Sequence, residues 1–163
     1  IMAGGDPAHL ERVALLFGAM GSRVVHAGGP GAGQVTKAVN QLVVMATIEV
    51  VAEALVLAAK AGVSPSKVRE ALLGGFAQSR ILDSHGERML RRDFRPGGRT
   101  ELHRKDIEVI GALARASGIT LPAFEAAAAQ VEALIAHGGG GLDHSALVTE
   151  LERSAGVELS AGW

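Results

Sequence analysis

The feature that most constrains this chain is the run from Gln34 to Ala61, which contains neither glycine nor proline. A glycine-rich turn at 28–33 precedes the run, and Gly62 follows it. At about 1.5 Å per residue, a helix of this length extends roughly 40 Å, enough to span a small domain. The second half of the run is apolar on almost every side, which is typical of a buried helix. We therefore predict one long helix that forms the centre of the fold.

Three polar residues near the start of this helix share one face. Lys37, Asn40 and Gln41 stand at i, i+3 and i+4. A cation close to a helix N-terminus opposes the macrodipole, and burial against the apolar helix body would also disfavour the charged ammonium. A lysine driven toward neutrality can act as a general acid/base. The alternative is a surface lysine that extends past the helix end into solvent.

Composition limits the functions open to the chain. Of its 163 residues, 48% are hydrophobic but only 3% aromatic, so the core must consist of alanine, valine and leucine. The 16 basic and 17 acidic residues are interspersed and leave a net charge of −1, which predicts neither nucleic-acid binding nor a polybasic membrane surface. With no cysteine, disulfides and thiolate metal sites are excluded, and the expected location is the cytoplasm.

Two further patterns argue against a membrane span and a metal site. The apolar run from Leu42 to Ala59 carries Glu49 and Glu53 in its middle, which favours a core helix over a transmembrane one. The histidines show no ligand spacing such as H-x-x-x-H, so we predict no metal site. The six histidines are His9, His26, His85, His103, His137 and His144.

The first 33 residues have the pattern of a β-α-β unit. We predict strands at 1–3 and 23–27, joined by one helix of about three turns for which Asp6 is the N-cap and Pro7 the first residue. A single unit of this kind does not form a stable sheet by itself. We therefore expect the chain to be the C-terminal part of a longer protein.

From Gln34 onward the pattern predicts helices and no strand. After the long helix we expect helices at 66–73, 79–91, 101–116, 123–136 and 144–153, with Gly118 ending the fourth of the six. The four glycines 138–141 are expected to form a flexible loop, and residues 156–163 a flexible tail. The fold class is thus mainly α: an all-α domain at 34–155 behind a short β-α-β segment at 1–33.

Three motifs resemble the β-hydroxyacid dehydrogenase family, which includes 3-hydroxyisobutyrate dehydrogenase and tartronate semialdehyde reductase and, more distantly, 6-phosphogluconate dehydrogenase. The first is the Gly29–Gln34 turn followed by Lys37 and Asn40-Gln41, similar to the family's catalytic-lysine signature. The second is Phe94-Arg95-Pro96 followed by Lys105-Asp106. The third is the segment from Leu142 to Leu147, which resembles the start of the family's last helix.

The resemblance implies a role for each matching residue. Lys37 would be the catalytic general acid/base, Asn40, Gln41 and Gly31 would bind substrate, and Lys105 would lie beside the nicotinamide of NAD or NADP. Residues 1–33 would close a Rossmann domain, and 34–155 would form the substrate and dimerisation domain. Asp106 is expected to have a structural role only. Phe76 and Phe94 stay open as site or core residues.

The implied reaction is hydride transfer between NAD(P)(H) and a small 3-hydroxy acid or semialdehyde. Lys37 would exchange the hydroxyl proton, and no metal would be needed. The G-x-G-x-x-G turn that binds dinucleotide phosphates does not occur in this sequence, so activity is expected to require the protein's own N-terminal Rossmann domain. The resemblance also implies a homo-oligomer.

The chain departs from the family pattern where it has Gly98 in place of a frequent aromatic residue, and His103-Arg104 in place of apolar residues. Two alternatives to the enzyme are a phosphate-binding loop at 29–33 and a non-catalytic helical dimerisation module. The loop follows a strand and precedes a helix, but it matches neither G-x-x-x-x-G-K-[ST] nor G-x-G-x-x-G. A dimerisation module would use the same buried helix but would not require the pair Lys37 and Asn40.

Overall fold

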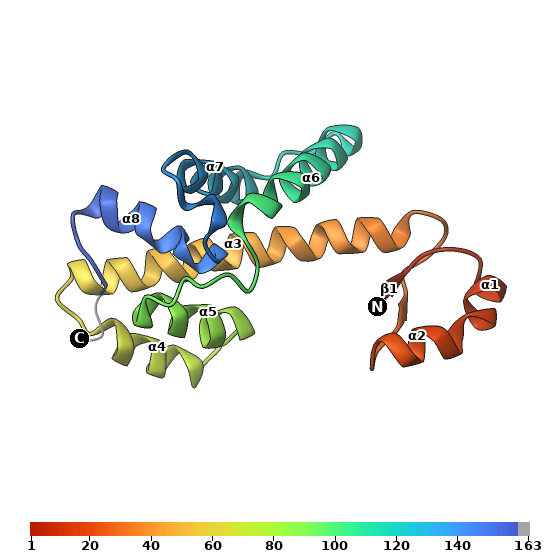
Figure 1. Cartoon of the computed structure of the whole chain (residues 1–163), viewed down its shortest axis with the longest axis horizontal. Coiled ribbons are helices and arrows are strands. Elements are labelled where there is room, and N and C mark those ends of the chain that lie inside the picture. The colour runs from red at the N-terminus through yellow and green to blue at the C-terminus, as the bar shows by residue number, and fades with distance from the viewer. Residues whose placement is uncertain (160–163) are drawn as a thin grey trace.

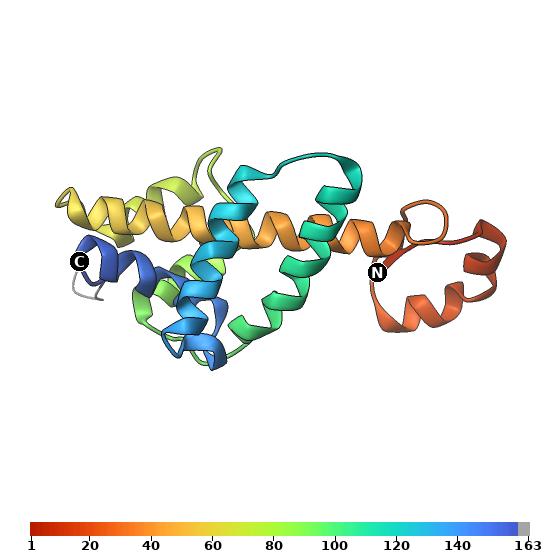
Figure 2. The same ribbon diagram turned by 90° about the horizontal axis from the view of Figure 1, so that it is seen from above.

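The computed structural model of the chain, which describes residues 1–159, is built around the helix α3. This helix runs from Ala32 to Lys60 and crosses almost the whole molecule in Figures 1 and 2. Gly31 precedes it with a φ of 90°, a left-handed conformation that glycine adopts without steric cost. Gly62, with a φ of 74°, follows its end. The predicted central helix is confirmed.

A small β-α-α-β unit lies at the N-terminal end of α3, apart from the other helices (Figure 1). The strands β1 (Met2–Ala3) and β2 (Val25–His26) pair in parallel, with Met2 opposite Val25. The helix predicted between them is two helices, α1 (Pro7–Arg12) and α2 (Ala14–Met20), which meet at Val13. Asp6 caps α1 as predicted, because its Oδ1 accepts a hydrogen bond from the Ala8 N–H at 2.8 Å.

Two glycines allow this unit to touch the first turn of α3. A Cβ on Gly33 would lie 2.7 Å from the carbonyl oxygen of Met2, and a Cβ on Gly4 would lie 2.7 Å from the backbone nitrogen of Gly33. Real side chains do not approach backbone atoms this closely. The backbone of β1 therefore rests directly on the backbone of α3, and any larger residue at either position would separate them.

The other helices pack around the rest of α3 (Figures 1 and 2). They are α4 (Pro65–Leu73), α5 (Arg80–Arg91), α6 (His103–Ser117), α7 (Pro122–Ala136) and α8 (Val148–Ala155). Three short 3-10 turns complete the chain: η1 (Thr100–Leu102), η2 (Gly139–Gly141) and η3 (His144–Leu147). The fold is mainly α, as predicted.

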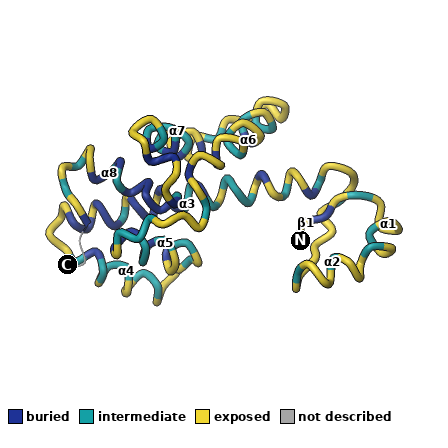
Figure 3. Tube along the Cα trace, in the orientation of Figure 1, coloured by how far each residue is buried: buried dark blue, intermediate teal, exposed yellow. Residues whose placement is uncertain are grey.

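The core surrounds the second half of α3, where the dark segments of Figure 3 converge. Ile48, Ala52 and Leu55 of α3 are at most 1% exposed, and they belong to one apolar cluster with side chains of α5, α7 and η3. By length and composition α3 could also cross a membrane, yet half of its most apolar stretch is buried inside the protein. Its packing against five other helices matches the predicted core helix.

Three details near the C-terminal half differ from expectation. The glycines of η2 form an ordered 3-10 turn in which Gly139 and Gly140 are buried, so this loop is held by packing. The helix expected at 101–116 begins only at His103, and Leu102, in η1, is 56% exposed. Leu159 is fully buried and its N–H donates to Glu152, so residues 156–159 pack on the domain. The remainder of the expected tail, 160–163, lies outside the described residues.

The close contact between β1 and α3 gives a prediction about glycine substitutions. Gly33→Ala should lower the free energy of unfolding by about 1–3 kcal/mol, because the added methyl overlaps backbone atoms that cannot move aside. Gly18→Ala is the control, since Gly18 lies inside α2 and a Cβ there meets nothing within 4 Å. It should stabilise by about 0.5–1 kcal/mol. Urea unfolding measures both, and equal effects would contradict the contact.

Glu49 is a carboxylic acid buried on the apolar side of α3. It is 5% exposed, and its Oε2 has no hydrogen-bond partner within the described part of the chain. Burial, with a smaller contribution from the neighbouring Glu53, raises the pKa of Glu49 to about 7. The folded protein therefore holds this proton more tightly than the unfolded chain does. Stability is lost as the pH rises from about 4.5 through 7.

Glu49→Gln should remove this pH dependence. At pH 8 the variant should be more stable than the natural chain by about 1–3 kcal/mol, and near pH 4 the difference should vanish because Glu49 is then neutral in both states. Glu53→Gln is the matched control, since Glu53 is exposed on the same helix and its loss should change stability by less than about 0.5 kcal/mol. A constant difference between Glu49→Gln and the natural chain from pH 4 to 8 would show that Glu49 titrates normally.

Candidate active site

An open cavity of about 670 Å³ lies where the N-terminal unit meets α3. It is lined by β1, by side chains of α1 and α2, by Gly31, and by Gln34 and Lys37 at the start of α3. The close backbone contact at Gly33 fixes the two walls relative to each other. The predicted catalytic lysine therefore faces a hollow that is large enough for a small molecule.

Lys37 is hydrogen-bonded to another predicted site residue. Its Nζ donates to Oε1 of Gln41 at 2.6 Å, and Nδ2 of Asn40 donates to the same oxygen at 2.9 Å. The three residues predicted to share a face thus meet at one atom. Of the two alternatives for Lys37, burial against the helix body or a surface position, the structure shows the second: the residue is exposed, because α3 extends beyond the other helices in its first turns.

Gln41 connects this group to α6. Its Nε2 donates to Oδ2 of Asp106 at 2.8 Å, and the side chain of Asp106 is only 17% exposed. Lys105 is beside it, with an 80% exposed side chain whose Nζ is 3.8 Å from Oδ1 of Asp106. The Lys-Asp pair of the second motif therefore lies next to the lysine signature of the first. Asp106 accepts from the amide that contacts Lys37, a pairing of the kind expected from its structural role.

Gly31 has a conformational role that the structure makes clear. Its φ of 90° turns the chain into α3, and its carbonyl oxygen accepts from the N–H groups of Gln34 and Val35. It also lines the cavity near Lys37. Its contact with a substrate stays a prediction.

The two phenylalanines left open by the sequence lie away from this group of residues. Phe76 is fully exposed in the turn between α4 and α5, whereas Phe94 packs partly buried against the core beneath the guanidinium of Arg92.

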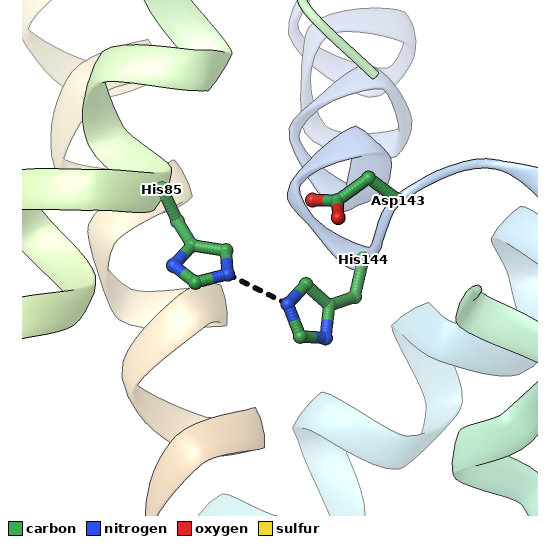
Figure 4. Close-up of side chains that lie close together, drawn as sticks. All are labelled: His85, Asp143 and His144. Atoms are coloured by element: carbon green, nitrogen blue, oxygen red, sulfur yellow. Dashed lines mark hydrogen bonds between the residues drawn. The ribbon is translucent and has the colours of Figure 1, made fainter. Parts of the chain in front are cut away.

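A cluster of three histidines lies behind Asp106. His103 at the start of α6, His144 in η3 and His85 on α5 form a continuous chain of rings. Nε2 of His103 is 2.7 Å from Nδ1 of His144, and Nε2 of His144 is 2.6 Å from Nε2 of His85 (Figure 4 shows the second contact). Nδ1 of His103 has no hydrogen bond among the described residues and faces Oδ2 of Asp106 at 3.7 Å.

Burial keeps these rings neutral near pH 7. It lowers the pKa of all three histidines, and the pKa of His144 falls to about 4. The negative charge of Asp143 opposes the shift in each case, and that of Asp106 opposes it for His103. Arg88 adds to the shift for His85 and His144, and Lys37 for His103.

Asp143 lies beside this cluster (Figure 4), and its carboxylate is fully occupied. Oδ1 accepts from the N–H and hydroxyl of Ser145, and Oδ2 from the N–H groups of Gly97 and Gly98. Burial raises the pKa of Asp143, but these hydrogen bonds outweigh burial and the net shift is downward. Asp143 thus ties the loop before α6 to η3, and it also forms the antiparallel bridge with Arg99.

His85, His144 and Asp143 have the composition of a metal site, since their ligand atoms lie within 4.8 Å of one another. The two imidazole nitrogens are hydrogen-bonded to each other, however, and the carboxylate has four hydrogen-bond donors with Nε of Arg88 at 3.6 Å. These contacts favour a hydrogen-bonded cluster over a cation site. Sequence spacing did not reveal the cluster because its members are far apart in the chain. In the sequence, the one sign of the cluster was His103, which stands where the resembled family has an apolar residue.

Comparison with known proteins agrees with the geometry. The family model described as "NAD-binding of NADP-dependent 3-hydroxyisobutyrate dehydrogenase" matches residues 31–151. The chain is 47% identical over 160 residues to a 2-hydroxy-3-oxopropionate reductase of Escherichia coli, covering 98% of this chain and 55% of that protein. It is 36% identical to a probable mitochondrial 3-hydroxyisobutyrate dehydrogenase-like protein of Arabidopsis thaliana, covering 99% of this chain and 48% of the relative.

Solved structures give the same assignment. A 3-hydroxyisobutyrate dehydrogenase of Salmonella typhimurium superposes with a TM-score of 0.85 at 26% identity, over 91% of this chain and 53% of that one. The Mycobacterium tuberculosis enzyme, solved with L-serine, gives 0.82 at 29% identity, over 92% of this chain and 54% of that one. The fold and motifs are those of a hydroxyacid dehydrogenase helical domain. The chain belongs to the 3-hydroxyisobutyrate dehydrogenase family, and it spans about half the length of the curated relatives it matches.

Asp143 provides a stability test of the scaffold behind the site. Asp143→Ala should lower the free energy of unfolding at pH 7 by about 3 kcal/mol or more, because four donors lose a buried charged acceptor. The loss should shrink as the pH falls below about 4, since a carboxylate with a lowered pKa contributes stability only above that range. Glu108→Ala, which removes an exposed carboxylate on α6, should stay within about 0.5 kcal/mol. Equal losses in urea unfolding would contradict the role of Asp143.

Proposed function

We propose that this chain supplies the substrate side of an NAD(P)-dependent hydroxyacid dehydrogenase in which Lys37 is the general acid/base. The observation that carries the proposal is the meeting of Lys37, Asn40 and Gln41 at one amide oxygen, beside the cavity and beside Lys105-Asp106. Residues from two separate motifs converge there. A helical module used only for dimerisation does not require this convergence.

In the proposed reaction Lys37 moves one proton at its Nζ. When a carbonyl substrate is reduced, the ammonium gives a proton to the oxygen that becomes the hydroxyl. When the hydroxy acid is oxidised, the neutral amine takes that proton back. Gln41 fixes the direction of Nζ, while Asn40, on the same face, is the candidate donor to the substrate's hydroxyl or carboxylate. The nicotinamide, when bound, supplies or accepts the hydride.

The residues present fit part of a dinucleotide site. Lys105 carries a cation into solvent next to Asp106 and is the candidate contact for the nicotinamide end of the cofactor. A separate N-terminal Rossmann domain would complete the site. Its expected neighbour is the N-terminal unit, where Leu15, Leu16 and Met20 of α2 are 92%, 65% and 76% exposed, an apolar surface suited to burial. A homo-oligomer formed through the helical domain belongs to the same proposal.

The proposed substrate is a small 3-hydroxy acid or the matching semialdehyde. The Escherichia coli relative is named for 2-hydroxy-3-oxopropionate, and other relatives for 3-hydroxyisobutyrate. These two compounds share a carboxylate and a C3 oxygen. Such a pair suits a site that offers one lysine and one neutral amide donor on the same helix face.

The test is a comparison of Lys37→Met with Lys60→Met in the protein that includes the Rossmann domain. Both substitutions remove an exposed amine from α3 and keep most of the side-chain volume, but Lys60 lies at the opposite end of the helix. NAD(P)H oxidation with 2-hydroxy-3-oxopropionate should fall about a hundredfold or more in Lys37→Met. Cofactor binding should be unchanged, and Lys60→Met should match the natural protein.

Other outcomes separate the alternatives. Equal turnover in Lys37→Met and the natural protein would show that Lys37 is only a lysine near a helix end. If neither the natural protein nor a variant oxidises NAD(P)H with 2-hydroxy-3-oxopropionate or another small semialdehyde, a binding or dimerisation module is favoured. Tight binding of inorganic phosphate that is lost on changing Gly29 or Gly31 would favour the phosphate loop.

A further inference from the structure

The contacts behind Asp106 form a path from Lys37 to the three histidines, with hydrogen bonds at every step except the 3.7 Å approach of Asp106 to His103. Lys37 donates to Gln41, Gln41 donates to Asp106, and Asp106 faces His103. The rings of His103, His144 and His85 then follow in hydrogen-bond contact (Figure 4 shows the last pair). The path joins α3, α6, η3 and α5, and its buried middle lies at His103, which is 6% exposed.

One arrangement of the protons starts from the outer end of this path. The hydroxyl of Ser84 lies 2.7 Å from the carbonyl oxygen of Arg80 and 2.9 Å from Nδ1 of His85. With its hydrogen on the Arg80 carbonyl, the hydroxyl accepts from Nδ1–H of His85. Nε2 of His85 is then an acceptor, which His144 fills with its Nε2–H. His144 in turn accepts at Nδ1 from Nε2–H of His103. With every ring neutral, Nδ1 of His103 is left as a buried acceptor with no donor.

An acceptor in this position is sensitive to one added proton. In this arrangement, Nδ1 of neutral His103 turns a lone pair toward the carboxylate of Asp106, 3.7 Å away. A proton at Nδ1 would convert this into an ion pair in a largely buried site. Asp106 would then be drawn toward His103, in competition with its hydrogen bond from Gln41.

We propose that Asp106 and His103 are positioning residues for Lys37: Asp106 holds the amide of Gln41 toward the ammonium, and uptake of one proton by the histidine chain at His103 weakens that hold. The amide of Gln41 cannot pass a proton on, so the path transmits geometry and not charge. Asp106 and His103 thus set the orientation of the general acid/base. The hydrogen-bond coupling stands by itself, and only its effect on catalysis rests on the proposed function.

The charges around the chain set the pH at which this occurs. His103 faces the anions Asp106 and Asp143 and the cation Lys37, while His144 and His85 face Asp143 and Arg88. Burial outweighs the anions and lowers the pKa of His103. The uncoupling of Gln41 is therefore expected on the acidic side of the range in which an exposed histidine titrates, near pH 6.5.

Side-chain NMR tests the coupling without any assay of activity. In the full protein labelled with ¹⁵N at glutamine and histidine, the Gln41 side-chain amide signal should shift with pH along the titration of His103. The shift should be lost in His103→Gln, which keeps a donor toward His144 but cannot titrate. It should also be lost in Asp106→Asn, which keeps an acceptor for Gln41 without the charge. Gln130 on α7 is the control amide and should not follow this titration.

The outcomes decide the proposal directly. A Gln41 signal that ignores the titration of His103 in the natural protein, or follows the same curve in His103→Gln, overturns it. In turnover, Asp106→Ala should lower kcat about tenfold with KM changed less than about twofold, and Asp106→Asn should restore most of the loss at pH 8. Equal kcat for Asp106→Ala and the natural protein overturns the positioning role. If Lys37→Met proves fully active, the proposed function fails while the NMR result still decides the coupling.

Discussion

The burial of α3 is the constraint on which the rest of the structure depends. Its second half is apolar on most sides, so most of these side chains leave water only where other helices pack against them. Helices α4 to α8 pack against it in this way. Because α5, α6 and η3 all contact α3, they also lie close to one another. The first turns of α3 extend beyond this packing and are left for the N-terminal unit and the cavity. One helix is thereby both the core of the domain and one wall of the site.

The site depends on the exposed end of that helix being placed as firmly as its buried end. Two observations explain how. Gly33 and Gly4 allow the backbone of β1 to rest on α3, and the hydrogen bond from Gln41 to Asp106 fixes the same helix to α6. Lys37 lies between these two attachments. An exposed lysine side chain is normally mobile, and here Gln41 restricts it. Lys37 is thus held by hydrogen bonding and not by burial.

Most buried polar side chains have hydrogen-bond partners among the described residues, but Glu49, His103 and Glu150 each keep one buried atom without a partner. Asp143 is inaccessible, yet its oxygens accept four hydrogen bonds, so the charge is held without large cost. The histidines satisfy one another except at Nδ1 of His103. Glu49 has an oxygen with no partner within the described residues, and its proton affinity rises accordingly. The unsatisfied nitrogen lies on the path to Lys37, whereas the unsatisfied Glu49 lies in the apolar core.

The sequence by itself determined the central helix, the mainly α fold, the capping residues and the shared face of Lys37, Asn40 and Gln41. These follow from local patterns: helical period, turn chemistry and a motif within one helix. It could not determine the break at Val13 or the burial of Leu159, because packing against distant residues decides both.

Only the tertiary structure joined Gln41 to Asp106, 65 positions further along the chain, and His85 to His144, 59 positions further. No spacing rule within a helix or strand links residues so far apart. Their contact exists because α5, α6 and η3 must all pack on the same buried helix.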